Sequence, residues 1–451
     1  MKLLDILKQP EGKTLEYKRD LSSTDGFLRT VVAFANTGGG IVLIGVEDET
    51  RHITGVADPH ALQKRAANLI HDGVAPRVLP DMEILAYRNE QVLSVQIHPS
   101  SLRPHCLSSV GEDSGTYVRV GSTNRRADAA LVAELKRYSR GESFDEWPMP
   151  DLDSEALDFR LASESFADYR QLRPGDLSTL RLITTYQNKE VPTVGGILLF
   201  GKDRLRHFPD AFVQAGRFQG TDRSVMLDHI ELKGSLIEAI DEAIAFVEKH
   251  SVHGFTIGRT RRVERWSLPP AALREAVINA VAHADYSQSG APIRLAMFDD
   301  RLEVENPGLL PFGMTVQELS LGVSRIRNRV IGRVFQELRL VEHWGTGVER
   351  MLTACRDAGL AEPEFQEIGM RFRVTFRLGQ ESAPQLDVTD AQIMEFICDA
   401  GGVGTKEIAA HIGLTVRATR TRLAALVDRG LLVEIGTGRH DPGRKYFAAG
   451  N

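Results

Sequence analysis

Three polar side chains recur at helical spacing in residues 267–287, SLPPAALREAVINAVAHADYS. Glu275, Asn279 and His283 are each four residues apart, so on a helix they lie on one face. A carboxylate one turn from an amide suits two linked tasks, because Glu275 can polarise a water molecule and Asn279 can ligate a Mg²⁺ ion that bridges phosphates. The alternative is an ordinary helix on which these residues only face solvent.

Two glycine-containing segments follow this helix in the chain. The strand pair in residues 293–311, IRLAMFDDRLEVENPGLLP, contains Asn306 and Gly308, and a glycine there lets the backbone approach a ligand closely. Residues 341–351, VEHWGTGVERM, place Gly345 and Gly347 directly before a predicted helix. Backbone N–H groups at a helix start attract phosphate, so this segment is a candidate phosphate cradle, with an ordinary helix cap as the alternative.

In this order the three segments resemble the N box and the two glycine boxes of the GHKL family, which includes the ATP-binding domains of gyrase and of histidine kinases. The resemblance covers residues 260–380 and implies a Bergerat-type α/β sandwich that binds ATP and Mg²⁺. It implies Glu275 as the water-activating residue and Asn279 as the metal ligand, and the expected nucleotide-binding residues are Asn279, His283, Asn306, Gly308, Gly345 and Gly347.

One position departs from the GHKL pattern. The family carries an aspartate that binds the adenine amino group, and this chain has Asn306 there. An amide oxygen can accept the same hydrogen bond but lacks the charge. The preference for adenine is therefore open at this stage.

A second group of chemically capable residues lies near the start of the chain. Residues 11–20, EGKTLEYKRD, place Glu16 and Lys18 on one face of a predicted strand, and Asp48 ends the strand-like run in residues 39–48, GGIVLIGVED. With residues 117–127, YVRVGSTNRRA, these segments resemble the Schlafen/AlbA-type α/β domain over residues 8–130. The resemblance implies nucleic-acid contact, for which the expected residues are Lys18, Arg19, Arg119, Arg125 and Arg126.

Some relatives of Schlafen domains are metal-dependent RNA nucleases with an acidic trio and a lysine. The matching positions in this chain are Glu11, Glu16, Lys18 and Asp48. Three carboxylates can hold divalent ions that activate water against a phosphodiester. The simpler alternative is a solvated cross-strand pair of Glu16 and Lys18 and a turn that begins at Asp48.

The last 65 or so residues predict helix, helix, turn, helix and a strand hairpin, with the turn at Gly413 and a helix cap at Thr415. From Lys406 to Lys445 there are eight Lys and Arg residues against four Asp and Glu residues. The pattern resembles bacterial winged helix-turn-helix regulators, which implies DNA binding. The expected DNA contacts are Arg417, Arg420, Arg422, Arg439, Arg444 and Lys445, and the alternative is a winged helix that binds protein.

The bulk composition fits a multidomain α+β protein. The chain has 451 residues and a net charge of −6, so nucleic-acid contacts must come from local basic patches. Three scattered cysteines without a CxxC pair, and no apolar run long enough to span a membrane, predict a cytoplasmic protein. The expected domains are 1–142 (Schlafen/AlbA-type), 155–255 (connecting α/β, with a strand at GGILLFG), 256–380 (GHKL-like) and 385–451 (winged helix-turn-helix).

Three functional interpretations follow. The first is a transcriptional regulator whose DNA binding is modulated by ATP, with at most weak ATPase activity. The second is an ATP-gated, metal-dependent nuclease that acts through the N-terminal carboxylates, with RNA as an alternative ligand. The third is a scaffold in which both sites are relics. The GHKL resemblance also implies a homodimer.

Overall fold

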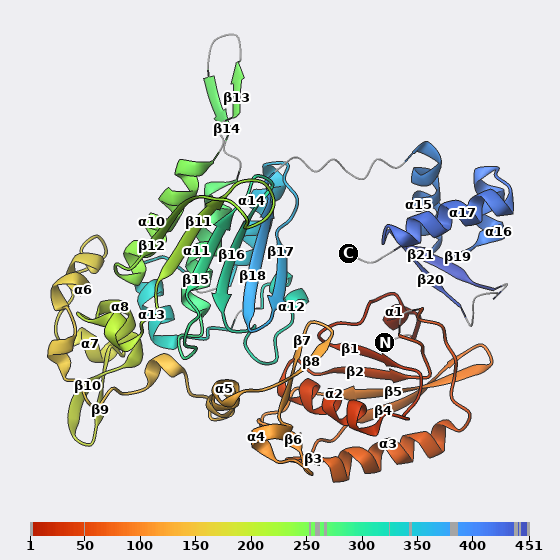
Figure 1. Cartoon of the computed structure of the whole chain (residues 1–451), viewed down its shortest axis with the longest axis horizontal. Helices are drawn as coiled ribbons and strands as arrows, with labels where there is room; N and C mark the ends of the chain where they lie inside the picture. Colours follow the sequence, from red (N-terminus) through yellow and green to blue (C-terminus); the bar gives the residue numbers. More distant parts are fainter. Residues whose placement is uncertain are drawn as a thin grey trace. The chain divides into compact units, whose positions relative to one another are not determined.

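The computed structural model describes residues 3–48, 50–251, 254–257, 262–265, 268–323, 325–341, 345–378, 387–436, 441 and 443–448. The chain forms two compact units (Figure 1). Unit 1 comprises Met1–Asp128 and Ser382–Asn451, and unit 2 comprises Ala129–Glu381. None of the helices in the described ranges is long and apolar enough to cross a membrane.

The N-terminal part of unit 1 is built on a four-stranded sheet in the order β1-β2-β5-β4, in which β1 and β2 are parallel and the other pairs are antiparallel. Apolar residues of α2 and α3 share one core with the sheet. The elements are α1 (Leu3–Leu7), β1 (Leu15–Lys18), α2 (Thr24–Asn36), β2 (Gly40–Ile44), α3 (Pro59–Gly73), β3 (Val74–Ala75), β4 (Asp81–Tyr87), β5 (Glu90–Ile97), β6 (Cys106–Leu107), α4 (Glu112–Gly115), β7 (Tyr117–Val120) and β8 (Thr123–Arg126).

The C-terminal part of unit 1 has the predicted winged helix-turn-helix order. Its elements are α15 (Val388–Ala400), β19 (Val403–Gly404), α16 (Thr405–Ile412), α17 (Val416–Asp428), β20 (Leu432–Ile435) and β21 (Lys445–Ala448). Gly413 ends α16 in the left-handed conformation that glycine adopts without strain, and the Thr415 side chain accepts a hydrogen bond from the backbone of Ala418 at the start of α17. Both details confirm the sequence prediction.

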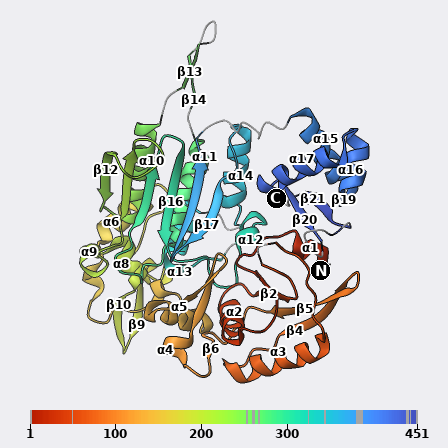
Figure 2. The same ribbon diagram turned by 45° about the vertical axis from the view of Figure 1, so that its right-hand side comes forward.

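Unit 2 is built on a six-stranded sheet in the order β12-β11-β15-β16-β18-β17. Helices α10 and α11 pack on one face of this sheet, and α14 packs against α11 (Figure 2). The sheet takes strands from both sides of residue 255, where the sequence suggests a domain boundary. The elements of its first half are α5 (Ala129–Ser139), η1 (Phe144–Glu146), η2 (Ser154–Ala156), α6 (Phe159–Phe166), α7 (Asp176–Thr179), β9 (Ile183–Tyr186), β10 (Lys189–Pro192), α8 (Val194–Phe200), α9 (Arg204–His207), β11 (Val213–Phe218), β12 (Met226–Leu232) and α10 (Leu236–His250).

The second half of unit 2 carries the elements that form the candidate site. They are β13 (Gly254–Ile257), β14 (Arg262–Arg265), α11 (Pro270–His283), β15 (Ile293–Met297), β16 (Arg301–Pro307), α12 (Val316–Ser320), α13 (Arg329–Glu337), α14 (Gly347–Asp357), β17 (Glu364–Ile368) and β18 (Arg371–Arg377). Side chains alternate between the two faces of a strand, so Asn306 on β16 shares the face of Leu302 and Val304, both of which lie in the core under the helices.

The opposite face of β16 is polar. Glu303 and Glu305 alternate with the core residues, and each is about 4% exposed. Arg373 pairs with Glu305 at 2.5 Å, and Arg223 pairs with Glu303 at 2.9 Å. These arginines offset the cost of burying the carboxylates, which allows the strand to keep one apolar face and one ionic face.

The segment GGILLFG is a correction to the sequence prediction. It was expected to be a strand, but residues 194–200 form the buried helix α8. A continuous apolar run has no alternation that could distinguish a buried strand from a buried helix. The Thr193 side chain caps this helix by accepting a hydrogen bond from the backbone of Gly196.

Candidate functional site

Helix α11 supplies the first group of site residues. Pro269 and Pro270 lie at its start, where a missing N–H costs no helical hydrogen bond. An apolar stripe of this helix is buried in the core of unit 2 and consists of Leu273, Ala276, Val277, Ala280 and Val281. Packing of this stripe fixes the helix and turns the adjoining face, with Glu275, Asn279 and His283, toward a cavity.

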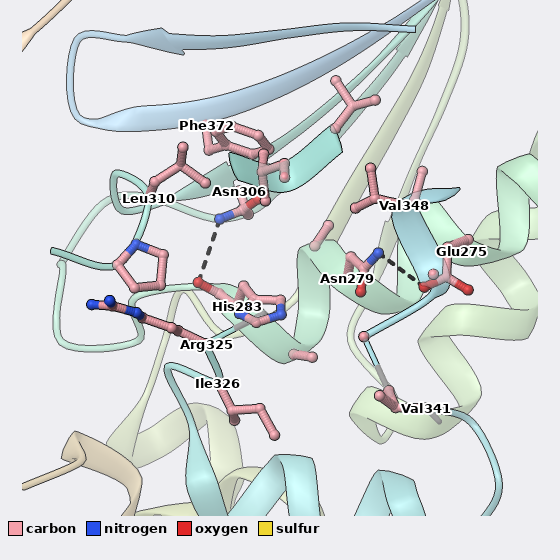
Figure 3. A pocket seen from close by; sticks show the side chains of 18 of the residues that line it. Glu275, Asn279, His283, Asn306, Leu310, Arg325, Ile326, Val341, Val348 and Phe372 are labelled. Carbon is pink, nitrogen blue, oxygen red and sulfur yellow. Dashed lines mark hydrogen bonds between the residues drawn. The ribbon is translucent and has the colours of Figure 1, made fainter. Parts of the chain in front are cut away.

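One cavity of unit 2 brings the three sequence segments together (Figure 3). Its lining includes six of the predicted nucleotide-site residues, namely Glu275, Asn279, His283, Asn306, Gly345 and Gly347. These residues come from α11, from β16 and from the start of α14, and up to 72 positions separate them in sequence. Gly308 is not part of the lining. Its φ of 96° turns the chain behind the cavity, and an added Cβ would lie 2.9 Å from the Cβ of Asp285.

The polar end of the cavity is organised around the Glu275 carboxylate, which is 9% exposed. The Asn279 amide nitrogen donates a hydrogen bond to Glu275 Oε1 at 3.1 Å, and Arg350 Nη2 donates to Glu275 Oε2 at 3.0 Å. Because the Asn279 nitrogen is used in this way, its amide oxygen is left as the group that can bind a ligand (Figure 3).

Gly347 makes this arrangement possible. A Cβ at residue 347 would lie 1.8 Å from Glu275 Oε1 and 2.5 Å from its Cδ, so the Glu275 side chain could not keep its position. The absence of a side chain at the start of α14 therefore leaves the space that the Glu275 carboxylate occupies. Gly345, with a φ of 67°, makes the left-handed turn that aims this helix start at the cavity.

The other end of the cavity is mostly apolar. Leu310 and Phe372 lie beside Asn306 in the lining (Figure 3). The Asn306 amide nitrogen donates to the carbonyl oxygen of Pro307 at 3.0 Å and to that of His283 at 3.5 Å, which leaves the amide oxygen as its acceptor. Burial, with a contribution from Arg327, lowers the pKa of His283 to about 4, so this imidazole is neutral at neutral pH.

Sequence reasoning missed two contributors to the site. Arg350 lies on the wall of the cavity and pairs with Glu275. The only sequence signal is its spacing, three residues after Gly347 and thus on the same side of the helix. The second contributor is the loop before α13, in which Arg325 and Ile326 also line the cavity. No local pattern marks this loop.

The N-terminal carboxylates lie close together in unit 1, but they serve internal contacts. Glu16 Oε2 accepts a hydrogen bond from Arg119 at 2.7 Å and Glu16 Oε1 one from Lys18 at 2.8 Å. Glu11 accepts a hydrogen bond from the backbone of Tyr17. Burial, together with the nearby charges of Glu16 and Asp48, raises the pKa of Glu11 to about 7. Among the residues described, no group of three or more acidic, His or Cys side chains is arranged to hold a metal ion.

Several expected nucleic-acid contacts have other roles in the structure. Arg119 is 1% exposed and is held by Glu16, by Asn124 and by the carbonyl oxygens of Gly12 and Leu15, so it is a buried structural residue. The expectation for Arg119 is corrected accordingly. Lys18 is partly buried beside Glu16, while Arg19, Arg125 and Arg126 are exposed.

In the winged helix, too, some of the expected DNA-contacting residues are exposed and others form internal ion pairs. Arg417 and Arg420 are exposed on one side of α17 with Thr421 and Ala424, at the spacing of one helical face. Arg422 instead bridges Asp387 and Asp390 at 2.5 Å and 2.7 Å, which ties α17 to α15. In the hairpin, Arg444 pairs with Glu434, Lys445 is exposed, and Arg439 lies outside the described residues.

The close approach at Gly347 generates a prediction. Gly347→Ala should destabilise the fold by about 1–3 kcal/mol, the usual cost of forcing an extra carbon into a packed site, because the new Cβ would overlap Glu275 Oε1. Chemical unfolding followed by circular dichroism measures the change. Gly175→Ala is the control, since a Cβ there meets no atom within 4 Å and the backbone is right-handed. Equal unfolding midpoints for the two variants would contradict this packing.

Comparisons with known protein families find three matches, which follow one another along the chain. Residues 11–128 match the family described as "Schlafen, AlbA_2". Residues 290–376 match the family described as "Putative ATP-dependent DNA helicase recG C-terminal", a match that begins after α11. Residues 386–433 match the family described as "Winged helix-turn-helix DNA-binding". A search of curated proteins finds no match.

Two solved structures are similar to this chain. The crystal structure of the DIP2311 protein from Corynebacterium diphtheriae is 20% identical, and the match covers 97% of this chain and 92% of that chain with a TM-score of 0.43. The N-terminal domain of a RecG-related protein from Nitrosomonas europaea, titled "Putative ATP-dependent DNA Helicase", is 24% identical over 28% of this chain and 94% of that one, with a TM-score of 0.23. The family matches carry the assignment: the chain is a DNA-binding protein made of a Schlafen/AlbA-type domain, an ATPase-like domain and a winged helix-turn-helix domain, in that order.

Proposed function

We propose that this protein is an ATP-dependent transcriptional regulator, in which nucleotide bound in the cavity of unit 2 modulates DNA binding by unit 1. The observation that carries the proposal is the meeting of Glu275, Asn279, Asn306 and Gly347 on one cavity. If the polar residues of α11 only faced solvent, they would have no reason to line the same cavity as Asn306 and Gly347. The match of residues 290–376 to an ATPase-like family gives independent support.

The two ends of the cavity suit the two ends of ATP. The apolar end, with Leu310 and Phe372, can take the flat base, and the Asn306 oxygen can accept a hydrogen bond from an exocyclic amino group. Adenine carries such a donor where guanine carries a carbonyl oxygen. The backbone N–H groups at the start of α14 can bind the phosphates. Asn306 is thus expected to favour adenine even without the aspartate of the GHKL pattern.

A Mg²⁺ ion fits the polar end of the cavity. The Asn279 oxygen, a hard ligand, is left unused by the hydrogen bond of its own amide nitrogen to Glu275. Asn279 would hold the ion, which supplies charge neutralisation between phosphates when bound. Glu275 is the candidate base for hydrolysis, and without nucleotide both of its oxygens accept hydrogen bonds. We expect at most weak ATPase activity.

A continuous set of contacts connects the cavity to the segment that follows Asp128. Asn328 donates from its side-chain amide to the carbonyl oxygens of Ala282 and Ala284, at the end of α11. The adjacent Arg327 pairs with Glu134 of α5, and the Arg325 guanidinium donates to the Tyr138 hydroxyl of the same helix. The loop before α13, which lines the cavity, is therefore held by contacts with α5.

The segment after α5 contacts the start of α13 through Asp145. The buried Asp145 carboxylate accepts hydrogen bonds from the backbone N–H groups of Arg329, Val330 and Ile331, and so caps α13 from another part of the chain. Since α5 begins at Ala129, directly after the Schlafen/AlbA-type match, a shift of the cavity loop would be passed to unit 1 along the backbone. This is the physical route that modulation by ATP requires.

The nuclease alternative has weaker support. Glu16, its central carboxylate, is neutralised by Arg119 and Lys18, and Arg119 is fully buried. A structural ion pair explains these residues without invoking catalysis. RNA as an additional ligand of the N-terminal domain, and a homodimer, stay part of the proposal as predictions from resemblance.

The nucleotide site can be tested with Asn279→Ala. Calorimetry should show micromolar binding of ATP to the wild type with Mg²⁺, and a loss of about 10-fold or more in the variant, because a ligand of the phosphate-bridging ion is removed. Gln288→Ala is a matched amide control, since Gln288 contacts Asp285 outside this cavity. A folded wild type that binds no ATP would eliminate the regulator proposal and leave a scaffold.

The DNA-contacting face can be tested with Arg417→Ala and Arg420→Ala. Each change should weaken DNA binding and reduce the salt dependence of the affinity by about one counterion, as expected for loss of a phosphate contact. Fluorescence anisotropy over a series of salt concentrations gives both quantities. Arg429→Ala, an exposed residue just after α17, serves as the control. Unchanged salt slopes would assign the winged helix to protein contacts.

The connection through α5 can be tested with Glu134→Gln, which removes the charge that holds Arg327. ATP should still bind within about threefold of the wild-type affinity, while the change that ATP causes in DNA affinity, typically about 5- to 150-fold in allosteric proteins, should fall toward none. Glu142→Ala is the control, because Glu142 is exposed in the same segment. If the Glu134→Gln variant keeps the full ATP effect on DNA binding, the coupling follows another route.

A further inference from the structure

We infer that Arg350 is the residue that selects a triphosphate, and that it does so by exchanging its Glu275 partner for the phosphates of the nucleotide. This inference rests on the proposed function and deepens it. Without nucleotide, Arg350 pairs with the carboxylate across the polar end of the cavity. With nucleotide, it moves to the phosphates and releases Glu275.

The position of Arg350 places it at the phosphate end. It lies in the first turn of α14, three residues after Gly347, and its side chain belongs to the cavity lining together with Glu275 and Asn279. Its guanidinium nitrogen is 3.0 Å from Glu275 Oε2. The backbone N–H groups of the same helix start are the expected phosphate ligands, so Arg350 is within one helical turn of them.

The unequal burial of the pair allows the exchange. The side chain of Glu275 is 11% exposed, whereas that of Arg350 is 46% exposed. The carboxylate is therefore largely enclosed, whereas about half of the arginine side chain is accessible to a ligand. Nucleotide phosphates can therefore reach the arginine, but its release leaves the buried carboxylate without this cation, a cost that the phosphates must offset.

Phosphate is the stronger partner. A guanidinium binds phosphate oxygens with two parallel hydrogen bonds, and a triphosphate carries several negative charges against one on Glu275. A nucleoside offers none of these charges, and a diphosphate offers fewer. Arg350 should thus contribute to ATP binding, less to ADP binding, and nothing to adenosine binding.

The ion pair with Glu275 leads to a second prediction. It would not follow if Arg350 bound phosphate without first leaving a carboxylate. To reach the nucleotide, Arg350 must first leave the carboxylate, so Glu275 opposes ATP binding through Arg350. Replacing Glu275 by glutamine keeps the shape and the acceptor oxygen but removes the charge. ATP affinity should therefore rise in Glu275→Gln, and only while Arg350 is present.

The test is calorimetry of ATP, ADP and adenosine with the full chain and Mg²⁺. Arg350→Ala should weaken ATP binding by about 10- to 100-fold, the usual effect of losing a charge-assisted hydrogen bond, and change adenosine binding by less than about twofold. Arg350→Lys should recover part of the ATP affinity, which shows that the loss comes from the charge and not from misfolding. Arg356→Ala is the control on the same helix, exposed and outside the cavity.

The outcomes separate this inference from the proposed function. Glu275→Gln should tighten ATP binding severalfold, and the double variant Glu275→Gln/Arg350→Ala should show no such gain. ATP binding by Arg350→Ala at wild-type strength, an equal loss of adenosine binding, or a gain that persists in the double variant would overturn the inference alone. A wild type that binds neither ATP nor adenosine would overturn the proposed function and this inference with it.

Discussion

The Glu275 carboxylate occupies the space that a side chain at residue 347 would fill, and the candidate site depends on this contact between α11 and the start of α14. At Gly347 the backbone itself touches the Glu275 carboxylate. The contact brings Arg350 within hydrogen-bonding distance of Glu275 and aims the N-terminus of α14 at the cavity. A larger residue would displace the Glu275 carboxylate from its hydrogen bonds with Asn279 and Arg350.

The sheet and the loops complete the cavity by different means. Strand β16 presents Asn306 on the same face as its core residues, so the base end of the cavity is set by the regular alternation of the strand. The loop before α13, through Arg325 and Ile326, supplies another part of the lining. Hydrogen bonds from Asn328, and those accepted by Asp145, hold that loop in place. One wall is therefore set by the strand, and the other by contacts with α5 and the residues after it.

Unit 1 illustrates how burial changes the meaning of charged residues. Glu16 and Lys18 match a nuclease pattern in sequence, and Arg119 resembles a nucleic-acid contact. In the fold the three form one partly buried ion-pair cluster. In the winged helix, Arg422 is likewise used internally, whereas Arg417 and Arg420 remain exposed. Charge alone predicts a basic patch, but only packing decides which of its members can reach a phosphate.

The sequence by itself determined the order of the domains, the helix that carries Glu275, Asn279 and His283, and the turn at Gly413, because helical period, proline and glycine are local signals. It also identified most of the polar lining of the cavity, since four-residue spacing defines a helical face. The tertiary structure alone decided that the buried run at residues 194–200 is a helix, that Arg119 is internal, and that Arg350 meets Glu275. These outcomes depend on contacts between residues that are far apart in the chain. Glu275 and Arg350, for example, are 75 positions apart, and no local sequence pattern indicates their contact.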